Sequence, residues 1–242
     1  MIEGGHSEIK AEDFSVAMKI SVIIVLLALA VFNTPAIGQV NSSLEVGAQH
    51  ILAFSKLHGN PFVNQMHTHT VSLGRSLYFQ YNTKSPFSVR AEPGFERKGS
   101  QLDVASTDMN GNPLGMTNVK IKLDYYTLPV LCRATFGSDK VNYFVNAGPF
   151  IGYLNRSSVY VSGGGMPDMD PMNDSGNYKE LDAGVSVGAG ITIPVKDVII
   201  FSVEARDNYG LYNTSRLPVI NNASVKTNSV CLLLAMGYRF GN

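Results

Sequence analysis

A histidine and serine group near residue 70 has types and spacing suited to chemistry. His67 and His69 stand two positions apart with His58 nearby, a spacing compatible with a metal on one face of a strand. Ser72 or Ser76 would be a nucleophile if one of these histidines acted as its base. No third metal ligand and no orienting carboxylate is evident. We therefore expect polar residues at the mouth of a strand, with no catalytic residue, metal or cofactor.

A second candidate lies in the segment SGGGMPDMDPMNDSG, within residues 156–177. Asp168, Asp170 and Asp174 offer the oxygen ligands that Ca²⁺ prefers. Their spacing lacks the central glycine and terminal glutamate of a calcium loop. The prolines and glycines favour a surface loop, whose three methionines suit contact with an apolar partner.

A third set of polar residues alternates with apolar ones. Along residues 86–98, Arg90, Glu92, Glu96 and Lys98 share one parity, and Phe87, Val89, Ala91 and Phe95 share the other. The runs at 198–212 and 225–240 alternate polar and apolar residues in the same way. Unpaired buried charges are costly, so we expect a connected structural network inside the fold. Its expected members are Arg90, Glu92, Glu96, Arg133, Asp182, Glu204 and Arg206.

The elements that must position these residues are strands, because the apolar residues recur at every second position. Eight such runs lie near 43–55, 68–81, 86–98, 117–136, 141–155, 178–194, 198–212 and 225–240. In LDAGVSVGAGITIPV, Leu181 to Val195, the polar face carries almost no large side chain. The interior of an eight-stranded barrel is just wide enough to be filled by side chains. We interpret this small-residue face as the crowded inside of such a barrel.

The connections between the runs alternate in length. Residues 82–85, 137–140 and 194–197 are tight turns, whereas 56–67, 99–116, 156–177 and 213–224 are long and polar. Short turns at one end and long loops at the other are typical of bacterial outer-membrane barrels. The pattern predicts an all-β, eight-stranded, antiparallel, up-and-down transmembrane β-barrel.

Two places depart from the outward apolar face. Arg75 has the parity of Leu73 and Leu77, which a bulge at Gly74 or a position near the lipid headgroups would explain. Lys120, Lys122 and Asp124 share the parity of outward residues in their strand. We expect that part of the strand to stand above the membrane.

The N-terminus has the three parts of a cleaved secretory signal peptide. Met18-Lys19 is followed by an apolar core, Ile20 to Phe32, and by Ala36-Ile37-Gly38 before the cleavage site. Residues 1–17 are acidic, which is wrong for a signal peptide, so we expect translation to start at Met18. The predicted division is an extension plus signal peptide over 1–38 and a barrel domain over 39–242.

The charge and the cysteines restrict the partners and the chemistry. The formal net charge is zero, so no overall field recruits nucleic acid. Cys132 and Cys231 fall on the fourth and eighth runs, which we do not expect to be neighbours. We expect two free thiols.

Five stretches of the chain resemble the PorT-like outer-membrane β-barrel proteins. They are EPGFERKG at 92–99, LDYYTLPVLCR at 123–133, NAGPFIGYL at 146–154, LDAGVSVGAGI at 181–191 and VEARDNYGLYN at 203–213. The resemblance implies an eight-stranded barrel in the outer membrane of a Gram-negative bacterium, and one branch of that family serves a protein secretion and gliding apparatus. It brings no catalytic residues. The chain departs from the family at Asp207, where an aromatic residue is expected, and in ending with Gly241-Asn242 after Phe240.

These patterns lead to a functional expectation. We expect a monomeric barrel with a structural or interaction role, as an envelope or secretion accessory or through adhesion-type loops. Its expected partners are outer-membrane lipid, lipopolysaccharide and envelope or secretion-apparatus proteins. A narrow porin-like channel is one alternative, and an enzyme that modifies lipid in the outer leaflet is another.

Overall fold

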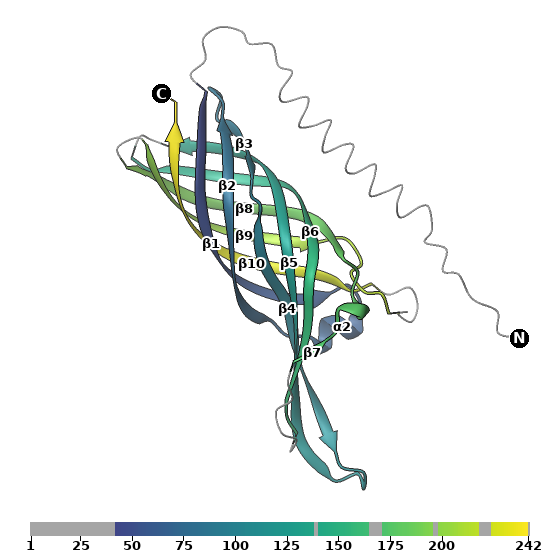
Figure 1. Cartoon of the computed structure of the whole chain (residues 1–242). Helices are drawn as coiled ribbons and strands as arrows, with labels where there is room; N and C mark the ends of the chain where they lie inside the picture. The colour runs from purple at the N-terminus through teal and green to yellow at the C-terminus, as the bar shows by residue number, and fades with distance from the viewer. Residues whose placement is uncertain (1–41, 138–139, 165–170, 196–197, 218–223, 242) are drawn as a thin grey trace, which may run out of the picture. The chain divides into compact units, whose positions relative to one another are not determined.

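The computed structural model describes residues 42–137, 140–164, 171–195, 198–217 and 224–241. The predicted signal peptide and N-terminal extension lie outside these residues. The elements are β1 (Ser43–His58), α2 (Pro61–Met66), β2 (Thr70–Asn82), β3 (Phe87–Ala91), β4 (Gly94–Thr107), β5 (Pro113–Gly137), β6 (Asn142–Gly163), β7 (Met172–Asn173), η1 (Ser175–Asn177), β8 (Leu181–Val195), β9 (Ile199–Gly210) and β10 (Lys226–Phe240) (Figure 1). In these ranges, no helix is long and apolar enough to cross a membrane.

The strands pair into a closed ring. Pairing runs from β1 to β2, then through β3 and β4 to β5, β6, β8, β9 and β10, and β10 pairs back to β1. Every one of these pairs is antiparallel, and most join strands that are consecutive along the chain. The predicted all-β, antiparallel, up-and-down barrel type is confirmed.

One predicted strand is broken. The run 86–98 divides into β3 and β4, with Glu92 and Pro93 between them. Proline has no N–H to donate to a strand ladder, so it interrupts regular pairing. The Pro93 carbonyl still accepts from the Leu77 N–H at 3.0 Å, and the Glu92 N–H donates to the Pro129 carbonyl at 3.0 Å. β3 and β4 both pair with β2 and β5, and together they fill one place in the ring.

Three strands are much longer than predicted. β5 has 25 residues and β6 has 22, and β4 continues to Thr107. The segments 99–116 and 156–177 were predicted to be loops, and this is wrong for most of the first and the start of the second. Their pairing continues through Leu102↔Val119 and Val119↔Val161. We call β4 residues 102–107, β5 residues 113–121 and β6 residues 159–163 the fin, which extends beyond the other strands (Figure 1).

Burial alternates along the ring strands. In β9, the outward residues Phe201 and Val203 are 45% and 41% exposed, whereas Glu204 and Arg206, at the alternate positions, are each 3% exposed. The fold thus places polar residues inside and apolar residues outside, the reverse of a protein in water. A lipid solvent requires this arrangement, because hydrocarbon cannot solvate polar groups.

Arg75 stays on the outward face. It lies between the exposed Leu73 and Leu77, and the β1–β2 register runs through Gly74 without a shift. The predicted bulge at Gly74 is therefore wrong. Arg75 pairs in register with His50 on one side and with Phe95 on the other.

Candidate functional site

The charged residues predicted to face inward all lie inside the ring, each at most 3% exposed. Glu92 is one centre of their network. It accepts hydrogen bonds from Arg90 Nε at 2.5 Å, Arg206 Nη2 at 3.0 Å and Gln49 Nε2 at 2.9 Å. Charge-assisted bonds of this kind offset the desolvation of a buried carboxylate.

Glu204 forms the second centre. It accepts from Arg206 Nε at 2.5 Å, from Arg133 Nη2 at 3.1 Å and from Asn146 Nδ2 at 3.1 Å. Arg206 therefore bridges two carboxylates, Glu204 on its own strand β9 and Glu92 in the break between β3 and β4. Each of the other two guanidinium groups covers an aromatic ring, with Arg90 3.6 Å from the Tyr78 centroid and Arg133 3.7 Å from the Phe144 centroid.

A third part of the network lies nearer to the fin. Asp182 accepts from Lys98 Nζ at 3.0 Å and from Thr227 Oγ1 at 2.7 Å. Glu96 accepts from the Ser229 hydroxyl and, at 3.3 Å, from Asn208 Nδ2. Each of these two carboxylates accepts at least two hydrogen bonds, and Asp182 Oδ1 is buried without a hydrogen-bond partner among the described residues. Carboxylates held in this way suit a structural role better than proton transfer.

The set predicted from sequence omitted several members of this network. Lys98 has the inward parity of its strand, but its partner on β8 is 84 residues away. Gln49 and Glu45 lie on β1, where the interior positions are mostly uncharged. Glu45 accepts from the Tyr78 hydroxyl at 2.8 Å and from Arg239 Nη2 at 3.5 Å. The period-2 parity of β1 was the available signal for both.

The small residues of β8 make room for their neighbours. A Cβ on Gly184 would lie 2.7 Å from Phe150 Cε1, and a Cβ on Gly190 would lie 2.5 Å from Phe144 Cζ. A Cβ on Gly188 would lie 2.5 Å from Glu204 Oε1. These larger side chains come from the adjacent strands β6 and β9.

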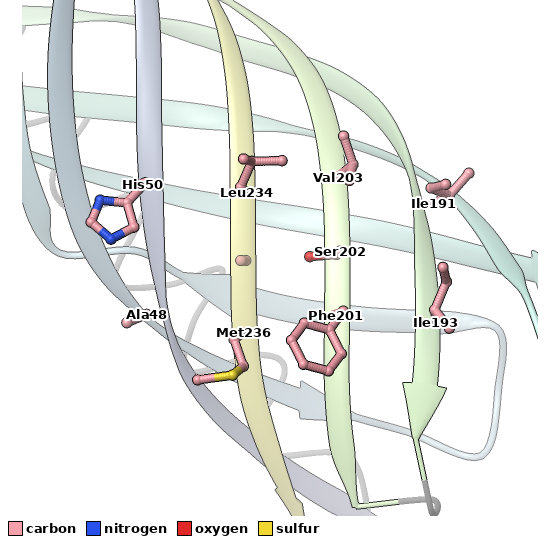
Figure 2. Close-up of a pocket in the computed structure, with 10 residues that line it drawn as sticks. Ala48, His50, Ile191, Ile193, Phe201, Ser202, Val203, Leu234 and Met236 are labelled. Atoms are coloured by element: carbon pink, nitrogen blue, oxygen red, sulfur yellow. The ribbon is translucent and has the colours of Figure 1, made fainter.

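A shallow apolar groove of about 350 Å³ lies on the outward wall (Figure 2). Outward side chains of four neighbouring strands surround it, including His50 from β1, Met236 from β10, Phe201 from β9 and Ile191 from β8. A surface with this lining suits lipid chains. A separate polar hollow of about 210 Å³ lies at the short-turn end and includes Arg133 and Arg239 in its lining.

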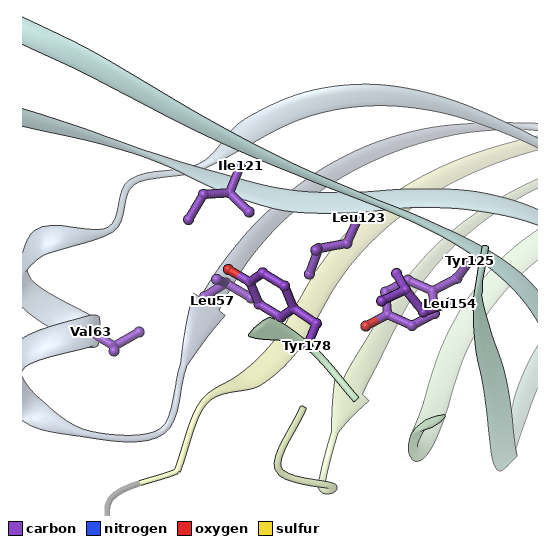
Figure 3. Packing of buried hydrophobic residues seen from close by; sticks show 7 residues of the cluster. All are labelled: Leu57, Val63, Ile121, Leu123, Tyr125, Leu154 and Tyr178. Carbon is purple, nitrogen blue, oxygen red and sulfur yellow. The ribbon is translucent and has the colours of Figure 1, made fainter. Parts of the chain in front are cut away.

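Apolar residues close the ring at the end near the fin (Figure 3). Val63 reaches this cluster from α2, and Tyr178 reaches it from the segment before β8. The remaining members come from β1, β5 and β6, and they are Leu57, Ile121, Leu123, Tyr125 and Leu154. We call these seven residues the apolar cap.

The structure does not bring the predicted serine and histidine residues together. His67 follows α2 and hydrogen-bonds through Nδ1 to Ser100 Oγ at 2.6 Å, and Ser100 is fully buried. Ser72 donates to the Arg97 carbonyl at 2.5 Å, and Ser76 is buried on the inward face. His67 and His69 do not share a strand face, because His67 ends the helix; that prediction is wrong. Burial lowers the pKa of His67.

Metal ligands do not gather in the described ranges, where no group of three or more His, Cys, Asp or Glu side chains forms. Asp168 and Asp170 lie outside the described residues, so the calcium hypothesis is examined only at Asp174. That carboxylate accepts a hydrogen bond from Asn177 Nδ2 within its own turn. His58 Nε2 lies 3.2 Å from the Thr227 carbonyl, and its ring packs on Tyr209.

The two cysteines are free, as predicted. Cys132 is exposed on the outward face of β5. Cys231 is buried inside the ring, with its Sγ 3.8 Å from Glu96 Oε1.

Comparisons with known proteins identify related barrels. A family model described as outer membrane protein beta-barrel domain matches residues 39–216. The Ail protein of Yersinia pestis is 13% identical over 84% of this chain and 100% of its own, with a TM-score of 0.37. The N-terminal barrel domain of Pseudomonas aeruginosa OprF is 10% identical over 84% and 100% of the chains, with a TM-score of 0.41. The Escherichia coli protease OmpT is 9% identical over 86% and 100%, with a TM-score of 0.34. A search of curated proteins gives no match.

Proposed function

Because the chain belongs to the outer membrane protein beta-barrel domain family, we propose that it is an integral outer-membrane protein of a Gram-negative bacterium with a structural or interaction role. We assign it to the PorT-like type on the five stretches that resemble those proteins. We also propose that the protein is a monomer whose wall has eight strands, with β3 and β4 counted as one. A path that steps from each residue to its paired residue on the next strand starts at Tyr143 on β6, crosses each of the other strands of the wall once and returns to β6 at Tyr153.

The proposed orientation follows from the connections. β2 and β3, β5 and β6, and β8 and β9 are joined by short segments at one end, where β1 begins and β10 finishes. Short turns face the periplasm in outer-membrane barrels. The fin and the apolar cap then lie on the outer side of the cell.

The observation that carries the proposed role is the filled interior. The network around Glu92 and Glu204 occupies the middle of the ring, and the apolar cap occupies the end near the fin. Small barrels of this kind hold side chains in place of an aqueous channel. We therefore propose that the barrel does not conduct and that its function lies in the parts outside the membrane.

The fin supplies a surface for such an interaction. Met116 and Leu114 are 58% and 43% exposed, and Val104 is 39% exposed. Beyond the Thr68–Gln101 bridge, β4 pairs only with β5 in the part of the chain that the structure describes. An exposed edge strand with apolar side chains is suited to pairing with another protein. We propose that an envelope or secretion-apparatus protein binds there.

We further propose that the protein is not an enzyme. The histidine best placed to act as a base, His67, contacts a serine that solvent does not reach, and Ser72 is engaged with a backbone carbonyl. A nucleophile needs access to its substrate as well as a base.

In-cell photocrosslinking tests this proposal. A crosslinking amino acid at Val104 or Met116 should trap a defined envelope protein, whereas the same residue at Leu234, on the lipid-facing wall, should not. Purified barrel in a planar bilayer should give no stepwise conductance. Conductance steps would instead support a narrow channel, and an altered lipid profile in a deletion strain would support the lipid-modifying enzyme. Recovery of the protein from the soluble periplasm would contradict the proposed location.

A further inference from the structure

Four cations stand on the outward face of three neighbouring strands at the base of the fin, with Lys120 inside its β5 segment and the other three just below it. Arg97 on β4 pairs in register with Asp124 on β5, which pairs in turn with Arg156 on β6. Lys122 and Lys120 follow on the same face of β5. Adjacent strands lie about 4.8 Å apart and alternate residues about 7 Å apart, so the side chains reach a common volume. We call Arg97, Lys120, Lys122 and Arg156 the cationic patch.

Two carboxylates lie on this face in the described residues. Asp103 is next to Lys120 on the diagonal and accepts from Asn118 Nδ2 at 2.7 Å, and Asp124 is neutralised by a patch member. Arg97 donates to Asp124 from Nε at 2.5 Å and from Nη2 at 2.9 Å, a bidentate pair. Within the described residues, Lys120, Lys122 and Arg156 make no ion pair. The patch therefore keeps an excess of positive charge.

The patch lies at a defined depth on the wall. Phe95, Tyr126 and Tyr153 form a row across β4, β5 and β6, and both tyrosines are 57% exposed. Arg97, Asp124 and Arg156 stand directly beyond this row, on the side of the fin. Outward aromatic residues mark the level of the lipid headgroups in membrane barrels. The patch is therefore at or just outside the headgroups.

The opposite rim of the wall has a different composition. Its outward residues in the described strands are aromatic or aliphatic, among them Phe79, Tyr81, Phe136, Tyr143 and Tyr238. Of the described cations at that end, Lys84 and Lys140 lie in turns, and Arg133 and Arg239 occupy inward positions of β5 and β10. Charge on the lipid-facing wall is thus concentrated at one rim.

We propose that the cationic patch binds the phosphate groups of a phosphorylated lipid in the outer leaflet, with the acyl chains lying against Phe95 and Tyr126. Arginine holds phosphate through its planar fork and lysine through its point charge. Lys122 is positioned for this by Tyr160, whose ring centroid lies 4.0 Å from Nζ. This inference rests on the proposed outer-membrane location and names a ligand of that lipid surface.

The proposal also accounts for Arg75. It is next to Phe95 in the same row, one strand further from the patch. The row runs obliquely round the ring, because following it from Tyr153 past Arg75 leads back to β6 at Tyr143, nearer the short-turn end, so Arg75 lies deeper in the apolar band. A long cationic side chain at such a position extends toward the headgroups and keeps its charge in a polar region. A lipid phosphate held at the patch would supply the counter-charge.

Native mass spectrometry of the detergent-solubilised full chain tests the proposal. The probe is diphosphorylated lipid A, compared with the same lipid after its phosphates are removed. Each cation near an anionic lipid surface contributes roughly a factor of five in binding, so K122Q/R156Q should weaken retention of the probe by about twenty-five-fold. The matched control K84Q/K140Q removes the same charge from the short-turn end and should retain the probe as the unmodified chain does. Wild-type retention should also fall as salt is raised.

Each other outcome contradicts the inference in a distinguishable way. Equal retention of the dephosphorylated lipid would show that only acyl chains bind. Equal competition by inorganic pyrophosphate would assign the patch to a soluble ligand. A K122Q/R156Q barrel that migrates as folded on unheated SDS gels yet retains the probe would remove the patch from binding. Absence of the protein from the outer membrane would defeat the proposed location as well, which fractionation detects separately.

Discussion

Lys98 and Asp182 form an ion pair across the inside of the barrel, with Nζ and Oδ2 3.0 Å apart and both side chains 0% exposed. They stand on β4 and β8, which are not neighbours in the ring. The Lys98 ammonium also lies 4.1 Å from the Phe150 centroid, and Thr227 donates to the same carboxylate oxygen. The pair thus ties two separate parts of the wall together through the interior.

Asp182→Asn should destabilise the barrel. The substitution leaves the buried lysine without its counter-charge, and losing one partner of a buried pair costs about 3–5 kcal/mol. Urea unfolding in lipid vesicles, followed by the mobility shift of unheated samples on SDS gels, measures the change. The double variant Lys98→Met/Asp182→Leu removes both charges and should recover most of the loss. A double variant as unstable as the single would argue against the pair as the cause.

Gly188→Leu should impair folding far more than Val187→Leu. A side chain at Gly188 meets Glu204 Oε1 at 2.5 Å and Asn146 Oδ1 at 2.7 Å from its Cβ, whereas Val187 is 58% exposed on the outward face. Overpacking costs about 1–3 kcal/mol or more, and an exposed substitution is usually within about 0.5 kcal/mol. The yield of heat-modifiable barrel from each variant decides the matter; equal yields would mean that β8 faces the other way.

Thiol labelling should report the two faces directly. In detergent micelles the folded barrel should react with one equivalent of N-ethylmaleimide, at the exposed Cys132. Cys231 is 2% exposed and should react only after unfolding. Cys132→Ser should abolish labelling of the folded form, and reaction of the folded variant would show that Cys231 is accessible.

His67 should titrate below its ordinary pKa of 6.5, because burial disfavours the imidazolium. The unfolded segment binds a proton more readily than the folded one, so the histidine's contribution to stability is present above pH 6.5 and declines as the pH falls toward the folded-state pKa. The histidine Cε1–H chemical shifts in micelles give the midpoint. His67→Gln should remove this part of the pH dependence, and a midpoint at or above 6.5 would contradict the burial of the ring.

The sequence predicted the strands of the membrane-spanning wall because lipid imposes a strict alternation there. In β9 and β10 the outward positions are apolar except near the long-loop end, where Asp207 and Asn228 lie, and each inward position must fit a crowded interior. The strands of the fin do not show this alternation, so the sequence did not predict them. Asp103, Ser106 and Asn118 resemble loop residues, yet outside the membrane both faces of a sheet meet water, so the strands continue without apolar alternation.

The sequence predicted which face of its strand each site residue occupies, but it did not predict which residue each one contacts. Parity placed Glu92 and Arg206 inside, but their contact joins residues 114 positions apart and depends on the size and stagger of the ring. The contact of His67 with Ser100 was not predictable either, because the position of the histidine depends on where α2 ends. A proline at position 93 suggests a break in the strand. The alternation of inward and outward side chains continues through Pro93, however, so the sequence pattern predicted one uninterrupted strand.

The closure of the ring between β1 and β10 determines when the barrel is able to fold. Leu44 pairs with Phe240 and His58 with Lys226, so the first and last strands of the wall meet along their whole length. Contacts between such distant parts of a chain form slowly, because the intervening loop must be ordered first. Until β10 is available, the edge of β1 and the apolar outward faces remain open to aggregation. We therefore expect the chain to need protection until β10 is available, and any delay in that strand to prolong the exposure.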